Sequence, residues 1–297
     1  MHQVTSQAFA ARRPLDPPAA ALSDTLDDVE AALTPPGFGV VAETDGEIVG
    51  SLIVRLDRAL DQASPIATLR RVGVLPNYRH RGVADAMVRA TLRGLAGGGV
   101  QKVRLLARAE LPLTIAWWRR HGFMVDHEVP HGYIMSVYLP APLLAATADD
   151  MSALGVTLAG ELRAGDVIIA SGELGAGKTV LAQGIGAGLG VAGPVISPTF
   201  VLARLHPSPT GPGLVHVDAY RLSSAAEFDD LDVEVGLPDA VTYVEWGAGL
   251  AEGLSDERLE VFIEVIDGAT RAVHLTPIGR RWREVDWDQL FKEAAHE

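Results

Sequence analysis

The sequence predicts an α/β protein in two parts, and three observations indicate it. Strand-like and helical runs alternate through both halves of the 297-residue chain. A Pro-containing stretch, Leu139–Ala148, separates the halves, because proline cannot continue a strand ladder. In the second half, the apolar run 166–170 leads directly into a glycine-rich loop and then a helical segment. We therefore expect one α/β domain over 1–140, a linker over 141–150, and a second domain over 151–297 with a mainly parallel sheet.

The expected elements follow from the spacing of apolar residues. In the first half we expect strands at 39–42, 48–54, 69–74, 102–106 and 133–138, and helices at 19–33, 83–95 and 113–121. In the second half we expect strands at 166–170, 214–217, 241–245 and 259–265, with helices between or after them.

Composition excludes several classes of protein. A hydrophobic content of 48% with 21% charged residues describes a globular chain. No apolar run approaches the roughly 18 residues of a membrane span, so we expect no membrane partner. The absence of cysteine excludes disulfides, thiolate zinc sites and cysteine nucleophiles. Because the N-terminus lacks a basic region followed by an apolar stretch, we expect a cytoplasmic location.

Charge is divided unevenly between the halves. Residues 1–145 carry 15 basic and 14 acidic side chains, whereas residues 146–297 carry 10 basic and 24 acidic ones. A strong grip on nucleic acid needs clustered Lys and Arg. We therefore expect the second half to bind a small nucleotide or a protein partner rather than to hold RNA directly.

The most specific motif is Gly172–Thr179, G-E-L-G-A-G-K-T, which fits the pattern of a phosphate-binding loop. Its glycines let successive backbone N–H groups point at a phosphate. Lys178 then reaches the β- and γ-phosphates, and the Thr179 hydroxyl can ligate Mg²⁺. Lys178 is one of only three lysines in a chain that otherwise uses arginine. The expected nucleotide contacts are Glu173, Leu174, Gly175, Ala176, Gly177, Lys178 and Thr179.

Two acids follow the loop, each at the end of an expected strand. Asp218 ends Val215–Asp218, and Glu245 ends Val241–Glu245. Ligands of parallel sheets lie outside the carboxyl ends of the strands, so both acids should converge on the loop. One can hold Mg²⁺ while the other positions the attacking water. The polar turn Ser197–Phe200 lies between these motifs and could sense the γ-phosphate.

Taken in order, G-E-L-G-A-G-K-T, S-P-T-F, H-V-D-A-Y-R-L and V-E-W resemble the TsaE (YjeE) family of ATPases, from about Leu154 to Leu275. The resemblance implies Mg-ATP as ligand, Thr179 and Glu245 as Mg²⁺ ligands, and Asp218 and Lys178 as catalytic residues. It also implies that Trp246 lies beside the site and that Arg271 lines the nucleotide. A threonine of the family that contacts the nucleotide aligns with Met151.

This resemblance also implies a role. The family serves threonylcarbamoyl modification of adenosine 37 in tRNA, and it acts through a complex of two paralogous partners, TsaB and TsaD. ATP binding and hydrolysis are expected to drive association with that complex and release from it. The acidic second half agrees with a protein partner.

The first half contains a weaker anion-binding motif. Arg79, Gly82 and Ala84 form R-x-x-G-x-A between an expected strand and helix, where backbone N–H groups and the helix dipole favour a pyrophosphate. With Trp118–Phe123 near its end, the half resembles the GCN5-related N-acetyltransferase (GNAT) family. The resemblance implies acetyl-CoA as cofactor, with expected contacts from Val74, Arg79, His80, Arg81, Gly82, Val83 and Ala84.

Two positions depart from the GNAT pattern. Trp118 stands where the family often has a tyrosine acid, and an indole cannot exchange a proton usefully. Leu111 stands where the family often has asparagine. The possible replacement acids are Glu43, Tyr78, His121 and Tyr133. The domain is therefore expected to bind acetyl-CoA, either as an acetyltransferase of unknown acceptor or as a module that has lost the reaction.

Other functions of a phosphate-binding loop remain open. A small-molecule kinase needs an arginine-rich lid, and only Arg204 and Arg221 lie in the central part of the second half. A GTPase is disfavoured because the guanine-reading N-K-x-D motif is absent. A nucleotide sensor without hydrolysis is a further alternative.

Overall fold

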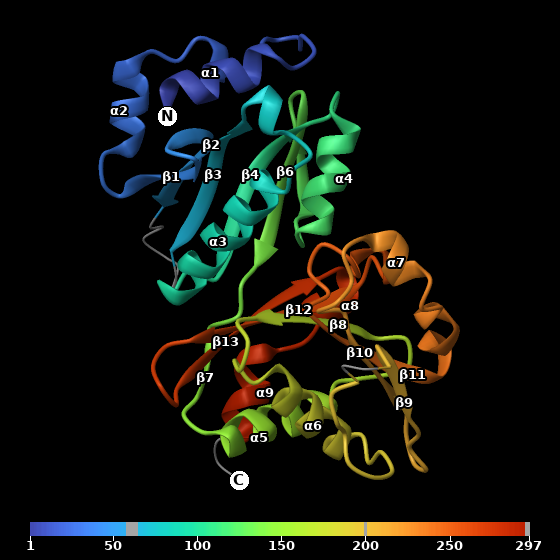
Figure 1. Cartoon of the computed structure of the whole chain (residues 1–297). Helices are drawn as coiled ribbons and strands as arrows, with labels where there is room; N and C mark the ends of the chain where they lie inside the picture. Colours follow the sequence, from blue (N-terminus) through green and yellow to red (C-terminus); the bar gives the residue numbers. More distant parts are fainter. Residues whose placement is uncertain (58–64, 199–200, 295–297) are drawn as a thin grey trace. The chain divides into compact units, whose positions relative to one another are not determined.

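The computed structural model describes residues 1–57, 65–198 and 201–294, and the chain divides into two compact units, Met1–Leu139 and Pro140–Glu297 (Figure 1). Each unit has its own sheet. Both sheets have helices packed against them, so each unit is of α/β type.

The first unit is built on a six-stranded sheet of order β1-β2-β3-β4-β6-β5. β3 and β4 run parallel, and the other neighbouring pairs run antiparallel. The strands are β1 (Gly37–Thr44), β2 (Glu47–Asp57), β3 (Ile66–Val74), β4 (Lys102–Arg108), β5 (Met124–Val129) and β6 (Gly132–Tyr138).

Helices cover this sheet on both faces. Leu52 and Val54 of β2 belong to the core that includes α3 and α4, whereas Ser51, on the opposite face, contacts Thr5 of α1 at 3.1 Å between hydroxyl oxygens. The helical elements are α1 (His2–Ala10), η1 (Ala20–Leu22), α2 (Leu26–Leu33), η2 (Pro76–Tyr78), α3 (Val83–Gly97) and α4 (Pro112–Arg120).

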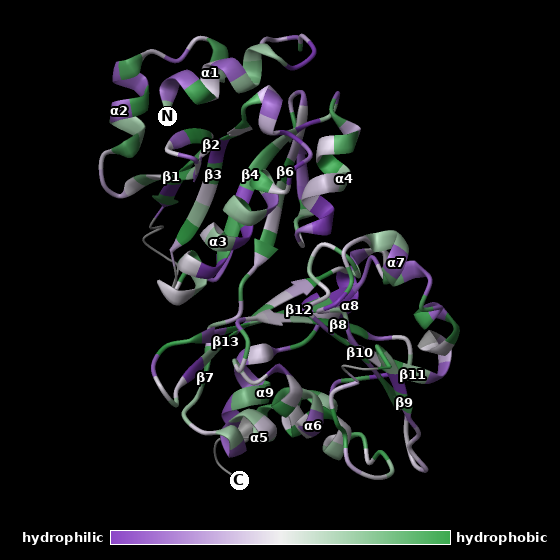
Figure 2. Ribbon diagram, in the orientation of Figure 1, coloured by the Kyte–Doolittle hydropathy of each residue, from purple (hydrophilic) through white to green (hydrophobic). Residues whose placement is uncertain are grey.

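The single helix expected over 19–33 is wrong, because the structure divides it into η1 and α2. Thr25 lies in extended backbone and caps α2 through a reciprocal pair of hydrogen bonds with Asp28. This capping box fixes the first helical residue at Leu26. Figure 2 shows the mixed polar and apolar residues of the short helix that remains.

The second unit is built on a seven-stranded sheet of order β7-β13-β12-β8-β11-β10-β9. The four central strands run parallel, while β7, β13 and β9 are antiparallel to their neighbours. The strands are β7 (Leu143–Ala145), β8 (Val167–Gly172), β9 (Ala203–His206), β10 (Gly213–Asp218), β11 (Ala240–Glu245), β12 (Arg258–Val265) and β13 (Arg271–Ile278).

The expected α/β fold class is confirmed, and the second sheet is mixed rather than strictly parallel. Its parallel centre carries the phosphate loop. Two antiparallel strands are added as hairpins, β9 with β10 and β13 with β12, and β7 pairs with β13 at the edge. Short hairpin connections join antiparallel neighbours without a crossover helix.

The stretch expected as a linker, 141–150, also has regular structure. Leu143–Ala145 pairs with β13 as the edge strand β7, and α5 begins at Ala148 after a capping box at Thr147. Pro140 and Pro142 precede the paired residues, so no ladder hydrogen bond is lost.

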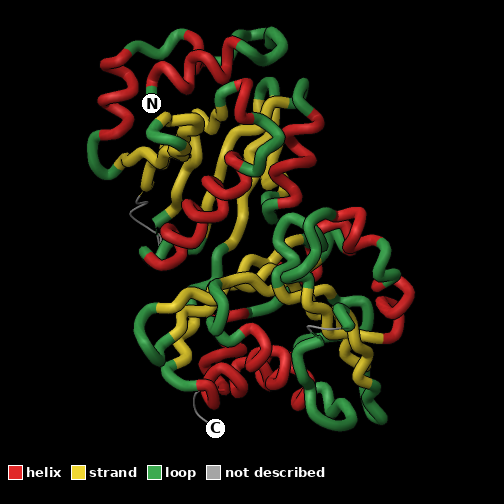
Figure 3. The backbone as a smooth tube through the Cα atoms, in the orientation of Figure 1, coloured by secondary structure: helices red, strands yellow, loops and turns green. Residues whose placement is uncertain are grey.

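The helical elements of the second unit are α5 (Ala148–Ala159), α6 (Lys178–Gly188), α7 (Ala225–Asp229), η3 (Val233–Asp239), η4 (Glu252–Leu254), α8 (Arg280–Arg283) and α9 (Trp287–Ala294). Figure 3 shows α5, α6 and α9 on one side of this sheet. α5 and α6 approach closely through glycines, since a Cβ at Gly184 would lie 2.1 Å from the carbonyl oxygen of Ser152. This contact fixes the helix that follows the phosphate loop.

Candidate functional site

The loop between β8 and α6 has a backbone that requires glycine. Gly172, Gly175 and Gly177 have φ values of 141°, 78° and 109°. A Cβ at Gly172 would also lie 2.4 Å from the carbonyl oxygen of Ile263 on β12. These glycines let the chain turn sharply from β8 into the N-terminus of α6, where unpaired N–H groups favour an anion.

Lys178 is held under this loop. Its Nζ donates to the carbonyl oxygens of Gly172 at 2.9 Å and Glu173 at 2.8 Å, and it lies 3.8 Å from the ring centroid of Trp246. Burial lowers the pKa of Lys178, while the nearby carboxylates of Glu245 and Asp218 act in the opposite direction. The ammonium therefore lies where it could donate to a phosphate in place of the loop carbonyl oxygens.

The first turn of α6 is bonded to the end of β11. The Thr179 hydroxyl donates to Oε1 of Glu245 at 2.8 Å, and Nε2 of His216 lies 2.9 Å from the same oxygen. Glu245 is 3% exposed and His216 is fully buried. Sequence reasoning did not select His216, although it lies two residues before Asp218 and thus on the same face of β10.

The two acids lie on adjacent parallel strands at the same level. Asp218 of β10 is in register with Glu245 of β11, and Glu245 is in register with Ala170 of β8. Asp218 accepts hydrogen bonds from the Ser197 hydroxyl and the Tyr220 amide, each at 3.1 Å. Both acids thus lie at the carboxyl edge of the sheet that also carries the loop.

Two side chains flank these polar groups. Trp246 follows Glu245 with φ of 62°, a left-handed conformation that is uncommon for a bulky residue, and its ring centroid is 5.0 Å from that of Tyr220. Met151 of α5 is buried, and its Cε lies 3.5 Å from where a Cβ of Gly177 would be. The position aligned with a nucleotide contact therefore packs against the loop.

The remaining predicted residues are placed differently. Leu174 is 82% exposed at the loop, whereas Ala176 is fully buried. Arg271 begins β13, and its guanidinium donates to carbonyl oxygens of the preceding turn, including Asp267 at 3.1 Å. Within the described ranges, none of its recorded hydrogen bonds reaches the loop. Of the turn Ser197–Phe200, Thr199 and Phe200 lie outside the described residues.

The donor set suits Mg²⁺ bound together with a nucleotide. Among residues 1–57, 65–198 and 201–294, no group of three or more His, Asp or Glu side chains could hold a metal alone. Mg²⁺ is usually held by one or two protein oxygens together with phosphates and water. The Thr179 hydroxyl and the Glu245 carboxylate, 2.8 Å apart, are such a pair of oxygen donors.

In the first unit, the loop between β3 and α3 offers backbone groups to an anion. Val74 ends β3, His80 and Gly82 have φ values of 60° and 75°, and Val83 and Ala84 open α3. No side chain caps the helix N-terminus. Its N–H groups therefore fit an anionic ligand.

The arginines of this loop are directed elsewhere. Nη2 of Arg79 donates to the carbonyl oxygen of Ala8 at 2.7 Å, at the end of α1. Arg81 is exposed, with its guanidinium 5.3 Å from the ring centroid of Tyr78. In this arrangement Arg79 stabilises the C-terminus of α1, and anion binding by the loop would rest on the backbone.

The pairing of β3 with β4 ends before the loop begins. Their parallel pairing covers 66–68 with 102–104, so the carboxyl halves of both strands have no register with each other. Nη2 of Arg12 donates to the carbonyl oxygen of Val72 at 2.8 Å in this part of β3. Burial, and then the charge of Arg79, lowers the pKa of Arg12 to about 10.

Two of the candidate replacement acids in this unit, His121 and Tyr78, make contacts with other side chains. His121 is 4% exposed, with Nε2 2.8 Å from Asp85 and Nδ1 2.9 Å from the carbonyl oxygen of Trp117. Tyr78 donates its hydroxyl hydrogen to Glu47 at 2.9 Å, which raises the pKa of the phenol. Trp118 is buried in the core.

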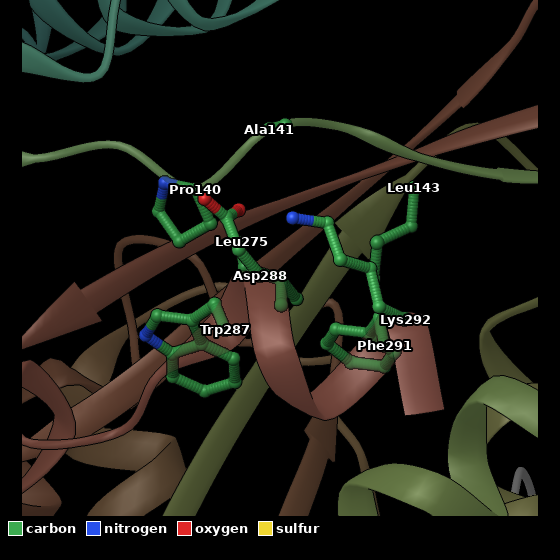
Figure 4. A pocket seen from close by; sticks show the side chains of 8 residues that line it. All are labelled: Pro140, Ala141, Leu143, Leu275, Trp287, Asp288, Phe291 and Lys292. Atoms are coloured by element: carbon green, nitrogen blue, oxygen red, sulfur yellow. The ribbon is translucent and has the colours of Figure 1, made fainter. Parts of the chain in front are cut away.

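A separate cavity of about 270 Å³ lies beside α9 in the second unit (Figure 4). Its lining is mainly apolar, with charge supplied by Asp288 and Lys292 of α9. It shares no lining residue with the loop or the two acids. The lining residues are Pro140, Ala141, Leu143, Leu275, Trp287, Asp288, Phe291 and Lys292.

Among the helices of the described residues, none has the length and apolar character needed to span a bilayer.

Comparison with known proteins gives two family matches. The model for "Threonylcarbamoyl adenosine biosynthesis protein TsaE" matches residues 145–273, and the model for "Acetyltransferase (GNAT) family" matches residues 5–123. Both resemblances drawn from the sequence are thereby confirmed.

One relative agrees with the TsaE match. The chain is similar to the tRNA threonylcarbamoyladenosine biosynthesis protein TsaE of Streptomyces coelicolor, with 54% identity over 142 residues, covering 46% of this chain and 96% of the relative. Among solved structures, YdiB of Bacillus subtilis has a TM-score of 0.41 and 26% identity, with 52% of this chain and 93% of that chain covered. The PaiA N-acetyltransferase of Thermoplasma acidophilum, in complex with coenzyme A, has a TM-score of 0.38 and 14% identity, with coverage of 46% and 88%.

Proposed function

We propose that the second unit, through which the chain belongs to the TsaE family, is a Mg²⁺-dependent ATPase. The first unit carries a GNAT-family acetyltransferase domain. The ATPase would serve threonylcarbamoyl modification of adenosine 37 in tRNA and act through a TsaB–TsaD-type complex. The observation that carries the proposal is the convergence of Lys178, Thr179, Glu245 and Asp218 at one edge of the sheet.

In the proposed mechanism, Lys178 leaves the carbonyl oxygens of Gly172 and Glu173 and binds phosphate oxygens of ATP. The loop N–H groups hold the same phosphates. Thr179 and Glu245 hold Mg²⁺, which when bound neutralises charge on the β- and γ-phosphates. The contacts that support these roles are the bonds of Lys178 to the two loop carbonyl oxygens and of Thr179 to Glu245.

Asp218 is proposed to orient the attacking water. Asp218 is 6% exposed, and its carboxylate accepts hydrogen bonds from the Ser197 hydroxyl and the Tyr220 amide. Glu245 instead accepts the Thr179 hydroxyl. This difference supports a division of labour in which Glu245 serves the metal and Asp218 serves the water.

A protein partner is supported by the surface beside the loop. Leu174 is 82% exposed and Tyr220 is 59% exposed. Apolar and aromatic side chains exposed next to a polar site are typical of a protein contact. We propose that ATP hydrolysis at the loop alters this surface and so changes affinity for the partner complex.

For the first unit we propose acetyl-CoA binding, with transfer of the acetyl group to an amine. The supports are the N-terminus of α3 after Gly82, which has no side-chain cap, and the short pairing of β3 with β4, which ends before the loop. Trp118 cannot act as the acid, so a module that binds acetyl-CoA without transfer is the alternative for this unit. An increase in melting temperature with millimolar acetyl-CoA tests the binding step, and no increase would contradict it.

Reconstituted tRNA modification tests the role of the second unit. The full chain is combined with the TsaB–TsaD pair of its own organism, threonylcarbamoyl-adenylate, unmodified tRNA and ATP, and the modified adenosine is quantified over many turnovers. We expect repeated turnover to require both the chain and ATP. Equal turnover without the chain, by a folded pair, would contradict the proposal.

A further inference from the structure

A fully buried histidine lies against the proposed metal ligand. Nε2 of His216 is 2.9 Å from Oε1 of Glu245, and that same oxygen accepts the Thr179 hydroxyl at 2.8 Å. None of the His216 side chain is exposed. One carboxylate oxygen on β11 is therefore contacted by a side chain of β10 and by a side chain of α6.

The hydrogen bond has a fixed direction. An ionised carboxylate only accepts, so the hydrogen in this contact is on Nε2 of His216. Its Nε2 makes the bond to Glu245, while its buried Nδ1 has no hydrogen-bond partner in the described part of the chain. The histidine thus acts as a buried donor aimed at the carboxylate.

The ring itself is held by its neighbour. Tyr243 of β11 is fully buried and packs edge-on against His216, with ring centroids 5.6 Å apart. The Tyr243 hydroxyl donates to the carbonyl oxygen of Lys178 at 2.7 Å. The same two strands that hold Glu245 therefore also hold the first turn of α6, on which Thr179 lies.

We propose that His216 is a positioning residue that orients the Glu245 carboxylate, beside the Thr179 hydroxyl, for binding the Mg²⁺ of Mg-ATP. This inference rests on the proposed ATPase function. A carboxylate that binds a metal is commonly fixed by a further hydrogen bond, and losing such a bond typically weakens metal affinity by about 10–100-fold. Nucleotide contacts made by the loop backbone do not depend on this bond.

The test separates orientation of Glu245 from packing. His216→Phe keeps a planar ring and removes the donor, and His216→Gln keeps an amide donor near the position of Nε2. His206→Phe is the matched control. His206 is 5% exposed on the neighbouring strand β9, and its Nε2 has no hydrogen-bond partner in the described part of the chain.

ATP binding to each full-length variant is measured by titration calorimetry in EDTA and at a series of Mg²⁺ concentrations. For His216→Phe we expect the Mg²⁺ concentration for half-maximal enhancement of binding to rise about 10–100-fold. ATP affinity in EDTA should stay within two-fold of wild type, given the backbone contacts of the loop. His216→Gln and His206→Phe should behave like the wild type.

Two results would overturn the role of His216: an unchanged Mg²⁺ requirement in His216→Phe, or an equal loss of ATP affinity with and without Mg²⁺. If His216→Phe does not fold, His216→Asn, whose amide is too short to reach Oε1 of Glu245, is measured in its place. If Mg²⁺ does not change ATP binding by the wild-type chain, the proposed ATPase function itself is overturned. Failure of the His216 role and failure of the proposed function therefore give different results.

Discussion

Both units contain a strand–loop–helix motif with glycine in the loop, yet the surroundings of the two loops differ. At loop 172–179, side chains from the loop and from β10 and β11 meet within hydrogen-bond distance. At loop 79–84, the arginine of the motif bonds to α1, and the helix N-terminus has no side-chain cap. We propose that the second loop is a catalytic site because β10 and β11 place acids beside it, whereas the first loop would bind an anion through backbone N–H groups.

The largest expected effect is loss of the loop ammonium. Lys178→Ala removes the charge nearest to the transferred phosphate, and ATP hydrolysis should fall at least about 10²–10³-fold. Lys292→Ala makes the same charge change on α9 and should leave hydrolysis unchanged. Acetyl-CoA should raise the melting temperature of both variants by the amount that we expect for wild type. Hydrolysis at the wild-type rate by Lys178→Ala would contradict the proposal that loop 172–179 is catalytic and loop 79–84 is not.

The next effect separates the two acids. Asp218→Asn keeps the shape of the side chain and removes its negative charge, and hydrolysis should fall about 10²–10⁴-fold. ATP affinity in Mg²⁺, measured by calorimetry, should stay near that of wild type because the metal ligands are intact. A variant that loses Mg-ATP binding instead would show that Asp218, like Glu245, serves the metal.

A smaller effect is expected in the backbone of the first loop. Gly82 has φ of 75°, so Gly82→Ala should cost about 1–2 kcal/mol of unfolding free energy and weaken acetyl-CoA binding. Gly94→Ala, in the open interior of α3, should instead stabilise by up to about 1 kcal/mol. Thermal melting with and without acetyl-CoA measures both. Unaltered acetyl-CoA binding by Gly82→Ala would place the anion site elsewhere.

The smallest effect concerns acid stability in the first unit. Burial raises the pKa of Asp85, but the His121 contact and then Arg89 outweigh it and lower the pKa to about 2. The side chain is 37% exposed, so solvent screening reduces the stabilisation to about 1 kcal/mol.

Because the folded pKa of Asp85 is depressed, its stabilisation is present above the unfolded value near 4 and is lost as the pH falls through about 2. Asp85→Asn should therefore be less stable than wild type at pH 7, and the difference should shrink between about pH 4 and pH 2. Denaturant unfolding at several pH values measures it. A difference that is constant with pH would show that Asp85 makes no stabilising charge interaction with His121 or Arg89.

The sequence predicted best where local chemistry dictates structure. The loop glycines need left-handed backbone, and the acids Asp218 and Glu245 end apolar strands, so their place at one sheet edge followed from the pattern. His216 was missed because a histidine within a buried strand has no signature of its own. Its partner Glu245 is 29 residues away, and their contact exists only after β10 and β11 pair.

Weak local signals explain the other differences. β7 has three residues between prolines and a helix cap, too short for an alternating pattern to show. α1, with the sequence H-Q-V-T-S-Q-A-F-A, has low helical propensity and is held by packing on β2 and β3. The mixed character of the second sheet depends on hairpin pairing at its edges, which residue periodicity does not encode.

The most direct test of the central claim is steady-state ATP hydrolysis by the full chain, with and without the TsaB–TsaD pair of its own organism. We predict Mg²⁺-dependent hydrolysis that the pair stimulates strongly and that Asp218→Asn abolishes. Hydrolysis that a folded pair leaves unchanged, or that Asp218→Asn retains, would contradict it.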